Sequence, residues 1–242
     1  MTLTDPIDLT DPICTPNAGW SMAEMQGLLL DFNGTLSDDE RLLSELIREL
    51  AREALGVDLS ADRYTTAYAG RSDRGILTLL AAESTRPQAS VDDLLVELAR
   101  RYERAAATAD LIAQPTRDFV RAAAGRGLAL AVVTGASRQS VLPALHRAGL
   151  SELLPTVVAE EDVAAGKPHP EGFRRGAALL GLGDPRRVVV LEDSLPGLAA
   201  GRAAGMRVIA VAGTHPLSEL RPRCDGVLPT LTPAALHLRF GD

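Results

Sequence analysis

Several residues of this chain that suit chemistry stand directly after apolar runs. Asp31, Thr134 and the pair Glu192-Asp193 each follow such a run. A carboxylate delivered by a buried strand into a tight turn can act as a nucleophile or as a metal ligand. Lys167 is the one lysine of the chain, since every other residue of the Lys+Arg count is an arginine. A retained lysine is a candidate for a compact positive charge, and together these residues suggest an enzyme.

The scaffold that would position these residues is predicted to be a parallel sheet. Apolar strand patterns are found at residues 27–30, 128–133, 156–159, 188–191 and 207–211, with helical patterns at 138–148, 171–180 and 198–204. Fully apolar strands that alternate with helices indicate a parallel sheet covered on both faces. Ligands of such sheets bind at the carboxyl ends of the strands. We therefore predict an α/β fold whose polar groups converge at one edge of the sheet.

A helical insert separates the first strand from the others. Residues 40–55 carry leucines and an isoleucine at helical spacing, Gly56 is placed to end that helix, and further helical patterns cover 73–82 and 91–109. We predict a core formed by residues 26–38 and 111–242, with an all-helical domain at 39–110. Residues 1–25 repeat Thr-Asp-Pro-Ile without a periodic apolar face, so we expect them to form a flexible N-terminal extension.

Composition narrows the class of protein. The chain has 242 residues, 46% of them hydrophobic, and a net charge of −7, which argues against a nucleic-acid partner. It contains no apolar run of the roughly 20 residues that span a bilayer, and its start lacks the features of a signal peptide. Cys14 and Cys224 fit no metal spacing. We expect a cytoplasmic protein without a membrane partner, acting as a monomer or a homodimer.

Four motifs in a fixed order make the chain resemble the haloacid dehalogenase (HAD) superfamily. They are Asp31-Phe32-Asn33-Gly34-Thr35-Leu36, Val132-Val133-Thr134-Gly135, Gly166-Lys167-Pro168-His169-Pro170 and Leu191-Glu192-Asp193-Ser194. Gly197 and the Ala/Gly-rich stretch to Gly205-Met206 are similar to the beta-phosphoglucomutase-like subgroup of phosphatases with a helical cap. The resemblance implies a Rossmann-like core and identifies residues 39–110 as the cap.

The resemblance also implies a role for each motif residue. Asp31 would be the nucleophile that forms an aspartyl-phosphate, and Lys167 would neutralise the phosphoryl group and the nucleophile. Mg²⁺ would be held by Asp31, Asp193 and the backbone carbonyl of Asn33, with Glu192 acting through water or orienting. The further residues that the resemblance places at the substrate are Thr134, Gly135, Gly34 and, from the cap, Arg71. His169 is not expected to be catalytic.

Asn33 departs from the family pattern, which has an aspartate as acid and base at this position. An amide carries no titrating proton at neutral pH, and general acid–base catalysis contributes roughly 10²–10⁴-fold. We predict a magnesium-dependent phosphatase acting on a small phosphorylated metabolite, with Asn33 in place of the usual acid. Three readings stay open: a substrate with a good leaving group, another group that supplies the proton, or a phosphate-ester-binding protein with little turnover. A sugar phosphomutase is a further alternative, disfavoured by Asn33.

Overall fold

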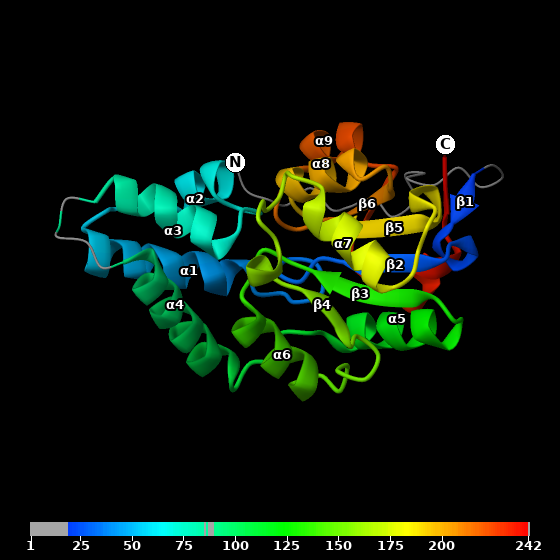
Figure 1. The fold of residues 1–242 in the computed structure, drawn as a ribbon, viewed down its shortest axis with the longest axis horizontal. Helices are drawn as coiled ribbons and strands as arrows, with labels where there is room; N and C mark the ends of the chain where they lie inside the picture. Colours follow the sequence, from blue (N-terminus) through cyan, green and yellow to red (C-terminus); the bar gives the residue numbers. More distant parts are fainter. Residues whose placement is uncertain (1–18, 85, 87–89, 242) are drawn as a thin grey trace.

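The structure is a computed structural model that describes residues 19–84, 86 and 90–241. Cys14 and residues 1–18 of the expected N-terminal extension lie outside this part of the chain. Figure 1 shows a sheet flanked by helices, with a group of helices at one end. The six parallel strands follow the order β4-β3-β2-β5-β6-β7. Their bounds are β2 Gly27–Leu30, β3 Ala129–Val133, β4 Thr156–Val158, β5 Val188–Glu192, β6 Arg207–Val211 and β7 Gly226–Leu228.

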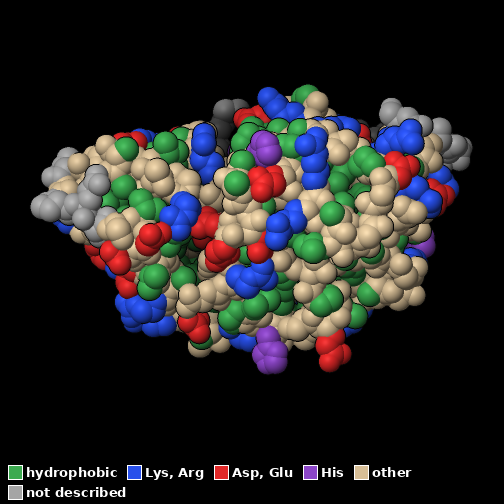
Figure 2. Space-filling model, in the orientation of Figure 1, with side chains coloured by type: hydrophobic (Ala, Val, Ile, Leu, Met, Phe, Trp, Pro, Cys, Tyr) green, Lys and Arg blue, Asp and Glu red, His purple; other side chains and the backbone are tan. Residues whose placement is uncertain are grey.

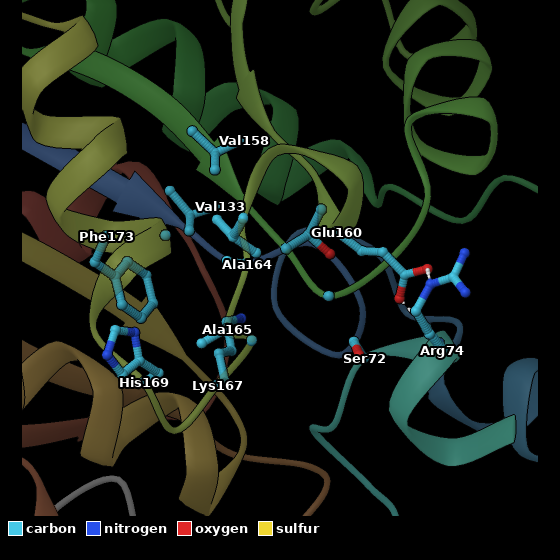
Figure 3. A pocket seen from close by; sticks show the side chains of 15 residues that line it. Ser72, Arg74, Val133, Val158, Glu160, Ala164, Ala165, Lys167, His169 and Phe173 are labelled. Carbon is cyan, nitrogen blue, oxygen red and sulfur yellow. Dashed lines mark hydrogen bonds and ion pairs between the residues drawn. The ribbon is translucent and has the colours of Figure 1, made fainter. Parts of the chain in front are cut away.

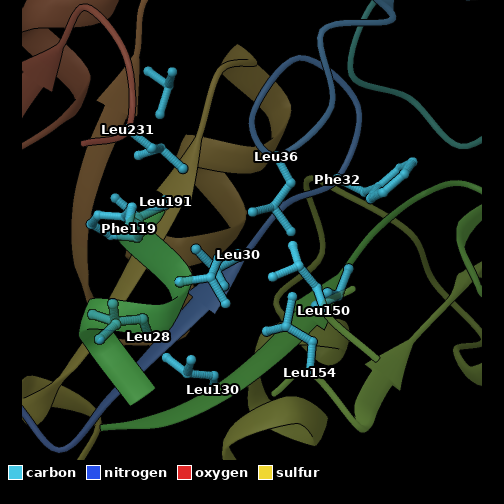
Figure 4. Packing of buried hydrophobic residues seen from close by; sticks show 14 of the residues in the cluster. Leu28, Leu30, Phe32, Leu36, Phe119, Leu130, Leu150, Leu154, Leu191 and Leu231 are labelled. Atoms are coloured by element: carbon cyan, nitrogen blue, oxygen red, sulfur yellow. The ribbon is translucent and has the colours of Figure 1, made fainter. Parts of the chain in front are cut away.

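Helices cover both faces of this sheet, as the apolar strands require. One face packs against α5 (Gln114–Gly125) and α6 (Arg138–Arg147), and the other against α7 (Glu171–Leu179), α8 (Leu195–Ala203) and α9 (Leu217–Leu220). Successive side chains of a strand point to opposite faces. In β2, Leu28 and Leu30 therefore join the first face (Figure 4), whereas Leu29 joins the second. The predicted α/β fold with a parallel, Rossmann-like sheet is confirmed.

The chain between β2 and α5 folds into four α-helices with a core of their own. They are α1 Glu40–Leu50, α2 Ala61–Ala67, α3 Asp73–Ala82 and α4 Val91–Ala106, and they lie beyond one end of the sheet in Figure 1. Leu43, Ile47 and Leu50 of α1 contribute to this core. Gly56 ends the α1 region with φ of 68°, a left-handed conformation that glycine adopts without steric cost. The chain enters and leaves the insert side by side, since the Asp38 N–H donates to the Leu111 carbonyl at 2.8 Å.

Several element bounds agree with the sequence patterns and some elements were missed. The helix at Asp73–Ala82 and the strand at Arg207–Val211 match to the residue. Helix α8 begins three residues earlier than predicted, because the Ser194 hydroxyl caps it by accepting from the Gly197 N–H. The short elements α2 and β7 were not predicted, and neither was α5. In α2 only Tyr64 is buried, so it gives almost no periodic signal.

The structure differs from the expectation of a loose extension over residues 19–25. Strand β1 (Trp20–Ser21) pairs antiparallel with β8 (Arg239–Phe240), so both ends of the described chain meet. Trp20, Met22 and Phe240 are buried in the core, and the rings of Trp20 and Phe240 lie 5.2 Å apart. The acidic, Pro-broken start concealed this segment, because two-residue strands leave no pattern in a sequence.

Charged side chains are spread over the surface of the described part of the chain. Among the described residues no helix is both long and apolar enough to cross a bilayer. Figure 2 shows acidic and basic side chains interspersed over the face seen in Figure 1. Hydrophobic side chains on this face occur between them in small groups.

We predict that Phe240→Ala destabilises the protein by about 3–5 kcal/mol, because it removes a fully buried aromatic side chain that packs on Trp20 and against Gly226. The measurement is urea unfolding followed by circular dichroism. Leu238→Ala is the matched control, since Leu238 is 39% exposed. Equal losses in the two variants would show that the β1–β8 pair is not part of the stable core.

Candidate active site

The carboxyl ends of three neighbouring strands bring the predicted site residues together. Strand β2 lies between β3 and β5, and these strands end at Asp31, Thr134 and the Glu192-Asp193 pair. One enclosed cavity is lined by all of these residues, together with the predicted Asn33, Gly135, Lys167 and Arg71. Residues separated by more than 130 positions in the sequence thus meet at one place.

Three buried carboxylates converge at the floor of the cavity. Asp31, Glu192 and Asp193 each offer an oxygen, and these oxygens lie within 4.8 Å of one another. Their exposed fractions are only 5%, 1% and 3%. Such a concentration of negative charge in a dry place needs a compensating cation.

Lys167 supplies one of the compensating charges. Its ammonium group forms ion pairs with Asp31 and Glu192 and lies 5.4 Å from the centre of the Phe173 ring. Figure 3 shows Lys167 beside Phe173 at the edge of a neighbouring pocket. Burial alone would lower the pKa of Lys167, but the two facing carboxylates outweigh it and raise the pKa overall. The single lysine is therefore a fixed positive charge.

One ammonium group does not balance three carboxylates. Burial raises the pKa of Asp31 to about 7, although Lys167 opposes this rise. Burial, with Glu192 and Asp31 nearby, raises the pKa of Asp193 well above its ordinary value. Asp193 accepts hydrogen bonds from the hydroxyls of Thr35, at 3.4 Å, and Thr214. These groups fit a divalent cation, which prefers carboxylate and hydroxyl oxygens.

Glu192 has less freedom than Asp193 to bind a metal directly. One of its carboxylate oxygens accepts from Lys167. The other accepts from the Ser194 N–H at 2.9 Å and from the Ser194 hydroxyl at 2.8 Å. With both oxygens engaged, Glu192 is suited to orient Lys167 and the start of α8.

Thr134 and Gly135 form the side of the cavity that suits an anion. The Thr134 N–H donates to the Val158 carbonyl, and its hydroxyl oxygen accepts from the Ala136 N–H at 3.0 Å. The hydroxyl proton of Thr134 stays available for a ligand. Helix α6 follows, capped by Ser137, and its N-terminus adds positive potential toward the cavity.

Gly34 shapes the backbone and lines the neighbouring groove rather than the enclosed cavity. Its φ is +75°, and a Cβ built there would lie 2.0 Å from an Asp193 carboxylate oxygen. Its N–H already donates to the Ser37 carbonyl at 2.8 Å. A side chain at this position would therefore displace Asp193, while the Gly34 amide is not free for a substrate.

The cap loop that carries Arg71 closes the cavity from above. A Cβ on Gly70 would lie 2.4 Å from the Ser194 hydroxyl oxygen. The Asp73 N–H donates to the Gly135 carbonyl at 3.2 Å, and the Arg74 N–H donates to a Glu160 carboxylate oxygen at 2.9 Å (Figure 3). The cavity enclosed in this way measures about 30 Å³, room for only a few water molecules.

The Asn33 side chain is turned toward a second acid. Its amide N–H donates to Asp39 at 2.9 Å, and the same Asp39 oxygen accepts from the Tyr102 hydroxyl. Asp39 is 1% exposed, and burial raises its pKa to about 6. An amide at position 33 thus supplies a hydrogen-bond donor where a carboxylate would face another carboxylate.

Sequence reasoning missed three groups around this site. Glu40 and Asp73 line the cavity from the cap side, and Thr214 bonds to Asp193. Thr214 follows strand β6, so its place after a strand end was a usable signal. Nothing in the acidic run at 38–40 distinguishes a carboxylate that faces the cavity from a solvated helix start.

Comparison with known proteins agrees with the resemblance seen in the four motifs. The family model described as haloacid dehalogenase-like hydrolase matches residues 25–205. Protein CbbY of Cereibacter sphaeroides is 31% identical over 84% of this chain and 91% of its own. Validoxylamine A 7'-phosphate phosphatase of Streptomyces hygroscopicus subsp. limoneus is 28% identical over 84% of this chain and 93% of its own.

Solved structures show the same likeness. CbbY from Rhodobacter sphaeroides in complex with phosphate superposes with a TM-score of 0.77 at 25% identity, covering 88% of this chain and 100% of the other. A beta-phosphoglucomutase from Clostridium difficile shares the fold, with a TM-score of 0.73, 18% identity, and coverage of 86% and 92%. With its four motifs gathered in one cavity, this chain belongs to the haloacid dehalogenase-like hydrolase family.

Proposed function

We propose that this protein is a magnesium-dependent phosphatase that hydrolyses a small phosphorylated metabolite through an aspartyl-phosphate on Asp31. The observation that carries the proposal is the single cavity in which a nucleophilic carboxylate, a buried ammonium group and a hydroxyl with a helix N-terminus meet. Each of these groups has a function in phosphoryl transfer, and few other reactions need all of them.

The reaction that this geometry supports has two steps. An Asp31 carboxylate oxygen attacks phosphorus as the bond to the leaving oxygen breaks, and that oxygen takes up a proton. Water then attacks the aspartyl-phosphate, loses a proton and restores the Asp31 carboxylate. Lys167, Thr134 and Gly135 would hold the phosphoryl oxygens throughout, so that the negative charge is met by donors already in place.

The proposed metal site consists of Asp31, Asp193 and the Asn33 backbone carbonyl, with Glu192 orienting or acting through water. Bound Mg²⁺ would supply charge neutralisation at the phosphoryl oxygens. The support for this site is the carboxylate cluster, in which burial, reinforced by the neighbouring acids, raises the pKa of Asp31 and of Asp193.

Arg71 is proposed to contact the substrate beyond its reacting phosphate. It lies on the cap loop that closes the cavity and is exposed to solvent. Phosphatases and CbbY are among the relatives, and one solved CbbY mutant holds xylulose-(1,5)bisphosphate. We propose a small phosphorylated metabolite for this chain, with Arg71 placed to meet a second anionic group.

We predict that wild-type protein with Mg²⁺ releases inorganic phosphate from at least one member of a panel of small phosphate esters, and that Asp31→Asn lowers the rate by roughly 10³-fold or more. Removal of the nucleophile also removes the covalent intermediate, which mass spectrometry of acid-quenched protein detects. Asp58→Asn, at an exposed acid, is the control. No phosphate release from any ester by wild type would overturn the proposed function.

We predict that Mg²⁺ stabilises the wild-type protein, by about 2.7 kcal/mol at a concentration one hundred times its dissociation constant, and that Asp193→Asn loses this effect. Asp62→Asn, at an exposed acid of α2, should keep it. The measurement is thermal unfolding with and without Mg²⁺. A full Mg²⁺ response in the Asp193 variant would place the metal elsewhere.

The thermal stability measured with and without Mg²⁺ should also depend on pH. Asp31 has a pKa of about 7 in the folded protein against an ordinary value of 3.8, so the folded state binds more protons between these values. Without metal, stability therefore rises as the pH falls from about 8 to about 5. Because Mg²⁺ competes with that proton, its stabilising effect should grow as the pH rises.

We predict that Asn33→Asp alone impairs the protein and that the double exchange Asn33→Asp with Asp39→Asn does not. The single change removes the hydrogen bond from Asn33 and sets two carboxylates together, whereas the exchange keeps one amide and one carboxylate. The measurements are thermal stability and kcat. If a group other than residue 33 already gives the leaving oxygen its proton, kcat of the double variant stays within about tenfold of wild type.

A larger increase in kcat of the double variant would favour the competing function, a protein that binds phosphate esters. A protein that binds phosphate esters with little turnover lacks only the proton donor, and the double exchange would then raise kcat by roughly 10²–10⁴-fold. The comparison thus separates an active phosphatase from a binding protein on the same scaffold.

A further inference from the structure

Glu40 stands at the boundary between the closed cavity and solvent. It is the first residue of α1, directly after the point where the chain enters the cap. Its side chain lines the enclosed cavity together with Asp31 and Asn33, and it also lines the larger open groove beside that cavity. Its carboxylate oxygen Oε1 is buried and has no hydrogen-bond partner among the described residues.

The groups around Glu40 come from four parts of the chain. Asp39 precedes it, Tyr64 faces it from α2, and Glu192 acts on it from the end of β5. Asp73 of α3 and Asp193 also interact with it through their charges. Apart from the Tyr64 hydroxyl these groups are acids. Burial, reinforced by Asp39 and Glu192 and opposed by Tyr64, raises the pKa of Glu40 to about 7.

We propose that Glu40 is the general acid and base of this active site and carries the proton that Asn33 cannot carry. The proposal rests on the phosphatase function proposed above and names the group that makes it workable. It follows from three observations: Glu40 lines the cavity that holds the Asp31 nucleophile, it has an unpartnered carboxylate oxygen, and it also lines the open groove.

Glu40 donates one proton and accepts another in the two steps, so the protons balance. In the first step the Glu40 carboxyl gives its proton to the leaving oxygen as the phosphorus–oxygen bond breaks. In the second step the Glu40 carboxylate takes a proton from the attacking water as the bond between phosphorus and Asp31 breaks. Glu40 therefore ends each cycle protonated, and its contact with the open groove lets it exchange protons with solvent between cycles.

The two neighbouring acids are less suited to this role. Asp39 does not line the cavity, and its oxygen Oδ2 is already held by Asn33 and Tyr102. Asp73 lines the cavity but not the groove, so it lacks the contact through which Glu40 can exchange protons with solvent. Glu40 alone of the three touches both spaces.

The test compares Glu40→Gln with wild type on two substrates in the presence of Mg²⁺. With a primary alkyl phosphate, whose leaving group needs a proton, we expect kcat to fall by roughly 10²–10⁴-fold. With 4-nitrophenyl phosphate the first step needs no acid, so the variant should release about one equivalent of nitrophenol rapidly and then stall at the aspartyl-phosphate. Glu49→Gln, at an exposed glutamate of the same helix, should behave as wild type.

A rescue experiment separates a proton-transfer role from a structural one. Adding the Asn33→Asp and Asp39→Asn exchange to Glu40→Gln restores a carboxyl group beside the leaving oxygen, and we expect kcat to return to within about tenfold of wild type. If Glu40→Gln fails to fold by circular dichroism, Glu40→Asp keeps a shorter acid, and we expect it to turn over without a burst.

The outcomes distinguish this inference from the proposed function. Wild type that hydrolyses both esters while Glu40→Gln keeps its kcat within about threefold would overturn the role of Glu40 and leave the phosphatase intact. A burst in Asp73→Asn but not in Glu40→Gln would transfer the role to Asp73. Wild type that releases no phosphate from any member of the ester panel would overturn the phosphatase itself.

Discussion

The structure depends on the balance of charge at the carboxyl ends of β2 and β5. Three carboxylates are buried there within reach of one another, and one lysine, Lys167 of the loop between β4 and α7, forms ion pairs with two of them. Burying a charge without a partner costs several kcal/mol, so the site is stable only when protons, a divalent cation or both are present. The same carboxylate cluster is thus the proposed place for the metal ion.

The cap completes this arrangement and restricts access to it. The loop at residues 70–74 rests on Gly135, Ser194 and Glu160, where glycines permit the close approach. The cavity beneath this loop measures about 30 Å³, room for only a few water molecules. The hydrogen bond between Asp38 and Leu111 holds together the two chain crossings that lead into and out of the insert. Glu40 lies two residues after Asp38, directly beside these crossings.

The sequence predicted the fold and the residues at the strand ends because both follow from local patterns. Apolar runs define the strands, and a parallel sheet gathers the residues that follow them. Glu40 and Asp73 were missed because their place at the cavity depends on residues that are distant in the sequence and close in space. Thr214 was overlooked although it follows β6. The same holds for Trp20 and Phe240, which pair across the whole length of the chain. No local rule reveals that the partner of Asp39 would be Asn33.

The hydrogen bond between Asn33 and Asp39 gives a structural reason for an amide, in place of the family's aspartate, at position 33. A carboxylate at position 33 would oppose Asp39 in a nearly dry place, and one of the two would have to hold a proton. The amide removes this conflict and fixes the Asp31 turn to the base of the cap. The chain thereby keeps a hydrogen bond but loses a proton donor, and the same acidic run places Glu40 one residue further on, facing the cavity with a free carboxylate oxygen. Substitution at position 33 is thus compatible with an active enzyme whose proton-transfer group has moved from the core to the cap.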